Sequence, residues 1–307
     1  MDKIEMLWSG GWDSTYMLCM EARKPITIRP YYIVFHRPGE KEERSAIFRI
    51  LNKIKQHKEF KARILPVKFI DKEVIKVPDE IKRVFYKFRP DYSLGGQYLQ
   101  LSSFALQHEG IYLGQERFYE NPGHLTKLLY DKGKLTFDNN QVGYLDKTCS
   151  DEDVFLLFGH YRFPIALKNE LMMVDDAKRL GFIDIMDESW FCYYPTKDGK
   201  PCGTCLPCIT KYNQHMYDRL PLEALARAEV KVSLPKLSVG VDLVRTFENY
   251  CKLKDGYSPA DIFRVGNPDD EFSQVMIQKM LNETNSFATY FEEKINNAMQ
   301  LLKSNPV

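Results

Sequence analysis

Short apolar runs alternate with helical patterns along the first half of the chain. Apolar and polar residues recur at three- and four-residue steps between the runs, which is typical of amphipathic helices packed on a sheet. The predicted strands cover 4–8, 31–36, 62–69 and 110–115, and the predicted helices cover 14–23, 42–56 and 99–109. Such alternation predicts an α/β fold, a parallel sheet with helices on both faces.

The second half of the pattern is different. Residues 130–148 are rich in turn formers and predict a loop or a hairpin insert, and residues 152–181 predict a strand-like run followed by a helix that ends at Gly181. Beyond residue 220 the pattern is helical, over 223–230, 240–253 and 270–303. We therefore expect three segments. They are an α/β domain over 1–185, a cysteine segment over 186–215 and a helical C-terminal extension over 216–307.

Charge and composition exclude only a few classes of protein. The chain has 43 basic and 42 acidic side chains, a formal charge of +1, so a general polyanion binder is not indicated. No run of 18 apolar residues occurs, which argues against a membrane-spanning helix. Acidic residues stand early in the chain and no secretory pattern is present. We expect a cytoplasmic protein.

Four of the seven cysteines are clustered. Cys192, Cys202, Cys205 and Cys208 follow the spacing Cys-x9-Cys-x2-Cys-x2-Cys. Two residues between thiolates let a tight knuckle present both sulfurs to one metal, and four thiolates make a closed tetrahedral site that suits structural Zn²⁺. An iron–sulfur cluster, a redox Cys-x-x-Cys pair and a metal-free group remain as alternatives.

The stretch "SGGWDST" at 9–15 follows the first predicted strand directly. A glycine turn leading into a helix aims free backbone N–H groups at one point, which lies at the positive end of the helix dipole and attracts phosphate. Ser9, Ser14 and Thr15 add hydroxyl groups, and Asp13 suits a Mg²⁺ ion that screens it from phosphate. A plain tight turn is the alternative interpretation.

This stretch resembles the pyrophosphate loop of the ATP pyrophosphatase superfamily. Together with the cysteine spacing, it resembles the 7-cyano-7-deazaguanine synthase family. "LKNEL", which contains Lys168 and Glu170, and "WFCY" at 190–193 are similar to further motifs of that family. The resemblance covers roughly residues 1–215 and implies an adenine nucleotide alpha hydrolase-like fold. It implies that ATP is bound by Trp8, Ser9, Gly10, Gly11, Asp13, Ser14 and Thr15.

The same resemblance implies a reaction. ATP and Mg²⁺ would activate a carboxylate like that of 7-carboxy-7-deazaguanine as its adenylate. A nitrogen nucleophile would then displace AMP, with Asp13, Ser14 and Lys168 as catalytic residues and Zn²⁺ on the four cysteines. The chain departs from the family at 35–43 and at 114–124, where the family's base-holding segment is absent.

Three alternatives remain open, and the departures fit the first of them. One is a divergent relative from bacterial antiphage defence that joins a deazaguanine to a partner protein. Another is a tRNA-modifying sulfurtransferase of the same superfamily, and a third is a zinc-stabilised nucleotide-binding module without enzymatic activity. The apolar stripes of the C-terminal extension are expected to pack mainly on the protein's own core, and any exposed remainder to bind a partner protein or form a homodimer.

Overall fold

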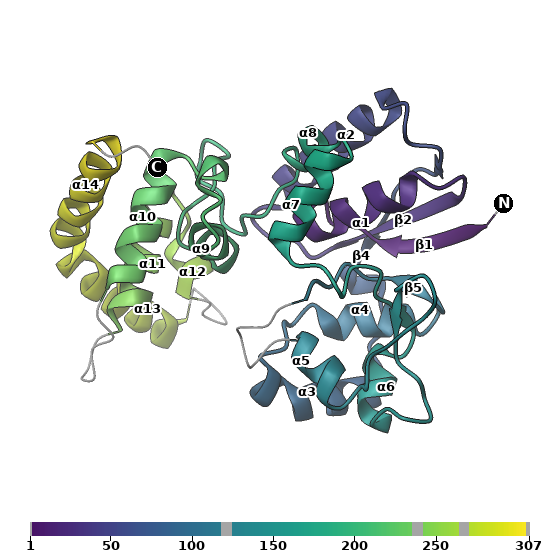
Figure 1. The fold of residues 1–307 in the computed structure, drawn as a ribbon. Coiled ribbons are helices and arrows are strands. Elements are labelled where there is room, and N and C mark those ends of the chain that lie inside the picture. Colours follow the sequence, from purple (N-terminus) through teal and green to yellow (C-terminus); the bar gives the residue numbers. More distant parts are fainter. Residues whose placement is uncertain (1, 118–124, 235–241, 264–269, 305–307) are drawn as a thin grey trace. The chain divides into compact units, whose positions relative to one another are not determined.

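The computed structural model describes residues 2–117, 125–234, 242–263 and 270–304. Its chain divides into two compact units, which we call the N-terminal unit and the C-terminal unit. The N-terminal unit comprises residues 1–36 and 40–190, and the C-terminal unit comprises 37–39 and 191–307 (Figure 1). The four clustered cysteines and the helices that follow them thus fall in the same unit.

The N-terminal unit is built on a parallel sheet. In the described residues its strands are β1 (Lys3–Leu7), β2 (Thr27–Val34), β3 (Arg63–Ile64), β4 (Lys68–Asp71), β5 (Ile111–Tyr112) and β8 (Tyr161–Arg162). The order is β3-β2-β1-β5-β8, with β4 also paired to β2, and every pairing is parallel. The α/β prediction is confirmed at this level.

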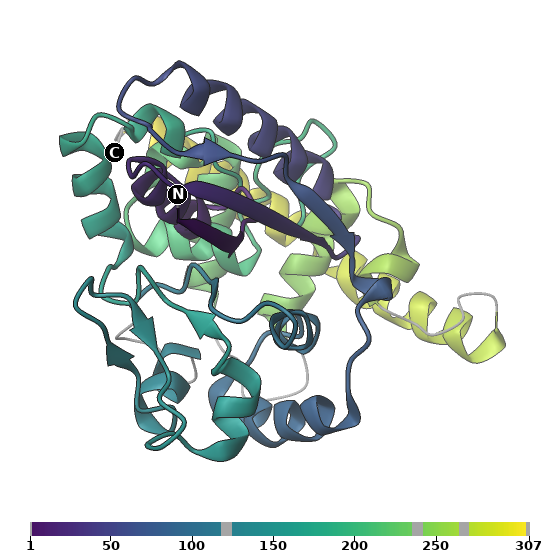
Figure 2. The same cartoon turned by 90° about the vertical axis from the view of Figure 1, so that its right-hand side faces the viewer.

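Helices flank the sheet. They are α1 (Trp12–Ala22), α2 (Glu40–Gln56), α3 (Asp79–Tyr92), α4 (Tyr98–Ala105), α5 (Leu125–Asp131), α6 (Glu152–Phe158), α7 (Glu170–Arg179) and α8 (Ile183–Met186), with a 3-10 turn at Lys72–Val74. Tyr31 and Ile33 of β2 lie in the same core cluster as apolar residues of α3 to α6. Tyr32 stands between them, so its side chain points to the opposite face, where its hydroxyl donates to Glu43 of α2 at 2.6 Å. Figure 2 shows α2 on one side of β1 and β2 and α3 on the other. Both faces are therefore covered.

Two local predictions need correction. The expected strand over 62–69 is split into β3 and β4, which both pair with β2; Pro66 lies between them and has no N–H for a ladder. The strand predicted for the apolar run after residue 152 is wrong, because this run forms α6. Asp151 accepts from the amides of Asp153 and Val154 and so caps this helix.

Other local predictions are confirmed. The turn-rich insert contains a hairpin of β6 (Thr136–Phe137) and β7 (Gly143–Tyr144). The helix expected to end at Gly181 is α7. Gly181 has φ +77° and donates to Lys178, while Phe182 donates to Ala177, which is the Schellman arrangement.

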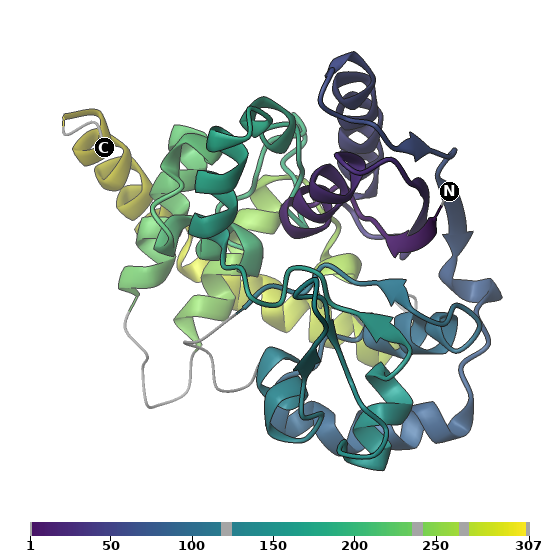
Figure 3. The ribbon, with the colours of Figure 1, turned by 45° about the vertical axis from the view of Figure 1, so that its right-hand side comes forward.

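The described part of the C-terminal unit is helical (Figure 3). Its elements are α9 (Leu206–Asn213), a 3-10 turn at Tyr217–Arg219, α10 (Leu222–Ser233), α11 (Leu243–Lys254), α12 (Pro259–Phe263), α13 (Glu271–Ser286) and α14 (Ala288–Ser304). Gly240 and Val241, placed at the start of a predicted helix, lie outside the described residues. Among the described helices, none has the length and apolar character needed to cross a membrane.

The helices of the C-terminal unit enclose their own core, as predicted, but not with every apolar residue. Phe247 of α11 and Phe291 and Ile295 of α14 are buried in one cluster. On α13 the pattern is reversed, since Phe272 and Val275 are 74% and 62% exposed while the polar Ser273 is buried. This helix therefore presents apolar side chains to solvent.

Candidate functional site

The glycine stretch connects β1 to α1 and occupies the carboxyl end of the strand. Gly10 has φ +73°, and a Cβ on it would lie 3.0 Å from Ile47 Cγ1 and 3.1 Å from the Glu43 carbonyl oxygen of α2. Gly11 is the N-cap residue of α1 and provides no side-chain hydrogen bond to the helix. Both a left-handed conformation and close packing therefore require glycine at position 10, and α1 begins without a side-chain cap.

Two serine hydroxyls hold the loop closed. The Ser9 amide donates to Ser14 Oγ at 3.3 Å, and the two Oγ atoms lie 3.2 Å apart. Ser14 Oγ also donates to the Gly11 carbonyl, and the Gly11 amide donates to Ser9 Oγ. These bonds are long and part-exposed, so an incoming oxyanion can compete for the same donors at low cost.

Trp8 and Thr15 lie deeper than the serines. Thr15 is fully buried and its Oγ1 accepts from the Trp8 indole Nε1 at 3.2 Å. This bond ties the end of β1 to the first turn of α1. Asp13 stands in the same helical turn and is half-buried, where the helix dipole favours a carboxylate.

Neighbours far away in sequence fix the loop in place. The Trp190 amide donates to the Gly10 carbonyl at 2.9 Å. A Cβ on Gly114, just beyond β5, would lie 3.1 Å from the amide nitrogen and from the Cα of Ser14. The end of β5 thus touches the start of α1. Neither contact was predicted; the isolated Gly114 at a strand end was the only local signal of a close backbone approach.

Histidine and aspartate side chains meet at the carboxyl ends of two other strands. His36 follows β2, Asp71 ends β4, and His36 Nε2 lies 2.8 Å from Asp71 Oδ2. Asp71 accepts from the Glu73 amide, and this bond, followed by the contact with His36, lowers the pKa of Asp71. Ligands of open parallel sheets bind at this edge.

Lys168 is held by a carboxylate. Its Nζ donates to Asp176 Oδ2 at 2.7 Å, and the hydroxyl of Tyr16, on α1, donates to the same oxygen at 2.7 Å. Burial raises the pKa of Asp176, but hydrogen bonds from Lys168, Tyr16 and Arg179 outweigh it and lower the pKa to about 2. The structure therefore links Lys168 through Asp176 to the helix that follows the glycine loop.

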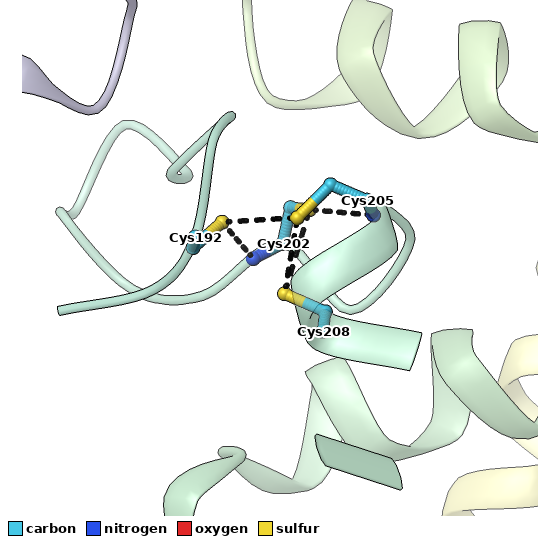
Figure 4. Close-up of side chains that lie close together, drawn as sticks. All are labelled: Cys192, Cys202, Cys205 and Cys208. Atoms are coloured by element: carbon cyan, nitrogen blue, oxygen red, sulfur yellow. Dashed lines mark hydrogen bonds between the residues drawn. The ribbon is translucent and has the colours of Figure 1, made fainter. Parts of the chain in front are cut away.

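The four cysteines of the C-terminal unit come together as one buried group. Figure 4 shows their sulfurs facing one another, and all four lie within 4.8 Å of one another. Separations are 3.4 Å for Cys205–Cys208, 3.8 Å for Cys192–Cys205 and 3.9 Å for Cys202–Cys208. Tetrahedral zinc with Zn–S bonds of about 2.3 Å places its sulfurs about 3.8 Å apart. The group can hold a metal ion such as zinc.

Backbone amides point at these sulfurs. The Cys202 amide donates to Cys192 Sγ at 3.2 Å, and the amides of Thr204 and Cys205 donate to Cys202 Sγ at 3.3 Å. Cys205 occupies the N-cap position of α9 and Cys208 lies in its first turn, where the helix dipole favours a thiolate. The backbone is thus arranged for negatively charged sulfur.

Gly203 allows the tight turn at residues 202–205, which we call the cysteine knuckle. It has φ +80°, and a Cβ on it would lie 2.2 Å from the Ala224 carbonyl oxygen of α10. Within the described ranges, no second group of three or more potential metal-ligating side chains is found. The donor set of four sulfurs suits zinc or iron, not a hard cation.

Comparison of the chain with protein-family models and with curated proteins finds no match.

Proposed function

We propose that the protein is an ATP-dependent, AMP-forming ligase that activates a carboxylate like that of 7-carboxy-7-deazaguanine for attack by a nitrogen nucleophile. The observation that carries the proposal is the position of "SGGWDST". It spans the turn from the first strand to a helix whose N-cap residue is a glycine, at the carboxyl edge of a parallel sheet. The amides of the first helical turn and the helix dipole favour the phosphates of ATP there.

The loop residues then have separate roles. Gly10 and Gly11 let the backbone approach the phosphates, and the hydroxyls of Ser9 and Ser14 exchange their mutual hydrogen bond for bonds to phosphate oxygens. Asp13 is the residue that would hold Mg²⁺, which supplies positive charge beside the phosphates. Trp8 and Thr15 stabilise the two ends of the loop through their buried hydrogen bond.

Two displacements complete the reaction. An oxygen of the acceptor carboxylate forms a bond to the α-phosphorus of ATP as the bond to the β-phosphate oxygen breaks, and pyrophosphate leaves. A nitrogen nucleophile such as ammonia then forms a bond to the acyl carbon, loses a proton, and AMP leaves with the former carboxylate oxygen. The loop amides stabilise the negative charge that develops on pyrophosphate. Lys168, positioned by Asp176, is proposed to offset part of the same charge.

The cysteine group has no part in these steps. Four thiolate ligands fill a tetrahedral shell and leave no open position, so zinc in this site would act on structure. The proposed residues are Cys192, Cys202, Cys205 and Cys208.

The test is an assay that contains ATP, Mg²⁺, ammonium and 7-carboxy-7-deazaguanine, with nucleotide products separated by chromatography. AMP and pyrophosphate, formed only when the acceptor is present, are the expected products. ADP as the product would overturn the assignment to the AMP-forming class. A brown protein that absorbs near 400 nm would instead favour the sulfurtransferase alternative with its iron–sulfur cluster.

A second acceptor is favoured by one observation on the C-terminal unit. Phe272, Val275 and Met276 lie at helical spacing on α13 and are exposed, which is the composition of a protein-binding surface. In this second proposal, a partner protein bound there supplies the nucleophilic amine, and the deazaguanine becomes attached to it. Intact mass spectrometry of proteins co-purified with the full chain tests it, since an attached base adds a fixed mass to the partner.

A further inference from the structure

Two cationic side chains of α10 donate hydrogen bonds to backbone carbonyls of the cysteine knuckle. Arg227 Nη1 donates to the carbonyl oxygen of Cys202 at 3.4 Å, and Lys231 Nζ donates to the carbonyl oxygen of Thr204 at 2.6 Å. The two carbonyls belong to the residues on either side of Gly203, and a Cβ on Gly203 would lie 2.7 Å from the Cα of Ala224 on the same helix. Arg227 and Lys231 are four residues apart, so both extend from one face of α10.

Each cation is held in turn by a carboxylate that belongs to α11 or caps it. Arg227 pairs with Asp255, the C-cap residue of α11, through two hydrogen bonds of 2.7 and 2.9 Å. Lys231 pairs with Glu248 at 2.5 Å. Arg227 is 2% exposed and Asp255 is 9% exposed, so this pair is shielded from solvent. The knuckle, α10 and α11 therefore share one chain of charged hydrogen bonds.

The hydrogen bond from Lys231 to the Thr204 carbonyl affects the hydrogen bond that the Cys205 amide donates to Cys202 Sγ. The Thr204 carbonyl belongs to the same peptide group as the Cys205 amide, and that amide donates to Cys202 Sγ. A cation on the carbonyl oxygen polarises the peptide group and strengthens the hydrogen bond from its N–H. It also fixes the plane of the peptide, and with it the direction of the N–H toward the sulfur.

We propose that Arg227 and Lys231 are positioning residues of the metal centre, so that metal binding and the packing of α10 and α11 form one coupled equilibrium. The coupling is reciprocal: the helices raise the affinity of the four cysteines for metal, and bound metal stabilises the helices. The proposal concerns the C-terminal unit and does not depend on ATP chemistry.

The experiment measures zinc affinity of the full chain by competition with a chromophoric chelator. It also measures thermal unfolding of the zinc-loaded and the chelated protein by circular dichroism. Lys231→Met removes the charged donor and keeps the apolar stem. Lys254→Met is the matched control, because Lys254 pairs with Glu292 in the same unit at 3.2 Å and is partly exposed. A second pair is Arg227→Lys with exposed Arg245→Lys as its control.

We expect both test variants to bind zinc at least tenfold more weakly, which is the usual range for residues that orient metal ligands. The stabilisation that zinc gives, measured as loaded minus chelated midpoint, should shrink in the test variants and stay unchanged in the controls. A purely structural role would lower both midpoints equally and leave zinc affinity within twofold of the original chain. That result would overturn the proposal.

A third variant covers the case in which a lone buried charge prevents folding. Arg227→Met combined with Asp255→Leu removes both members of the shielded pair, so no charge is left uncompensated in the interior. Retention of full zinc affinity in this double variant would overturn the role of Arg227. A loss of at least tenfold, with far-ultraviolet helicity retained in the zinc-loaded protein, would support it.

Discussion

The glycine loop of the N-terminal unit and the cysteine knuckle of the C-terminal unit both depend on glycine, yet they are held in opposite ways. The loop is closed by part-exposed hydroxyl contacts of 3.2 to 3.3 Å between Ser9, Ser14 and Gly11. The knuckle is buried, its sulfurs face one another, and Lys231 of α10 donates a short hydrogen bond of 2.6 Å to its Thr204 carbonyl.

This difference fits the roles proposed for the two sites. Weak, exchangeable contacts suit a site whose ligand enters and leaves, because the ligand replaces them without a large penalty. Buried and cross-braced contacts suit a permanent ligand that contributes to folding. Changes at the knuckle should therefore act on stability, and changes at the loop should act on turnover.

The largest effect is expected from Cys205→Ser. Loss of one thiolate opens the four-sulfur shell, and structural zinc contributes on the order of 10 kcal/mol of folding free energy in small domains. We expect loss of stoichiometric zinc, by elemental analysis, and an early thermal transition. Cys149→Ser, at an exposed cysteine outside the cluster, is the control. An unchanged midpoint with one zinc per chain would contradict the four-thiolate site.

The next effect separates close packing from backbone conformation. Gly203 and Gly181 have nearly equal φ values, +80° and +77°, but only Gly203 has a neighbour that a Cβ would strike. Gly203→Ala should cost roughly 3 kcal/mol, from left-handed strain plus the clash with Ala224. Gly181→Ala should cost roughly 1 kcal/mol, from the strain alone. Denaturant unfolding of both variants measures the two costs, and equal costs would contradict tight packing on α10.

A smaller effect concerns acid pH. The folded pKa of Asp176 is about 2, below its ordinary value of 3.8, so Asp176 stabilises the fold above pH 4. This contribution of roughly 2 kcal/mol is lost as the pH falls from about 4 to 2. Asp176→Asn should be less stable near neutral pH and should lack this part of the acid transition. Urea midpoints measured from pH 5 to pH 2 compare the two chains, and parallel curves would contradict the tie between α1, Lys168 and α7.

The smallest effect on stability, with the largest on turnover, is expected from Asp13→Ala. A half-buried residue in a first helical turn contributes little to the core, so unfolding free energy should change by less than about 1 kcal/mol. AMP formation should fall by about 100-fold or more, because the proposed Mg²⁺ ligand is lost. Asp175→Ala, at an exposed aspartate of α7, is the matched control. Wild-type turnover in the Asp13 variant would remove this residue from the proposed site.

Local patterns predicted much of the fold, and their failures have physical causes. Strand–helix alternation was enough for the parallel sheet, since each run carries its own period. It failed for α6, because a short apolar run has no period that separates a buried helix from a buried strand. There the capping by Asp151 decides the structure.

For the two sites as well, features within one short stretch of sequence could be predicted, and contacts between distant residues could not. The cysteine cluster could be predicted because its four sulfurs lie within one short stretch of chain. The contacts that hold the two sites in place could not be predicted. Trp190, which bonds to Gly10, and Asp255, which bonds to Arg227, act across long sequence separations and carry no local signal. Whether the loop binds ATP stays a prediction that the assays above decide.

The hydrogen bond from the Trp190 amide to the Gly10 carbonyl also has a consequence for the time course of folding. The loop leaves the ribosome well before Trp190, which lies about 180 residues later at the end of the N-terminal unit. At about 5 to 20 residues per second, the interval is on the order of ten seconds or more. Throughout it the nascent chain lacks the bond that fixes the loop. The proposed nucleotide site can reach its final form only after synthesis has arrived at the border of the cysteine segment.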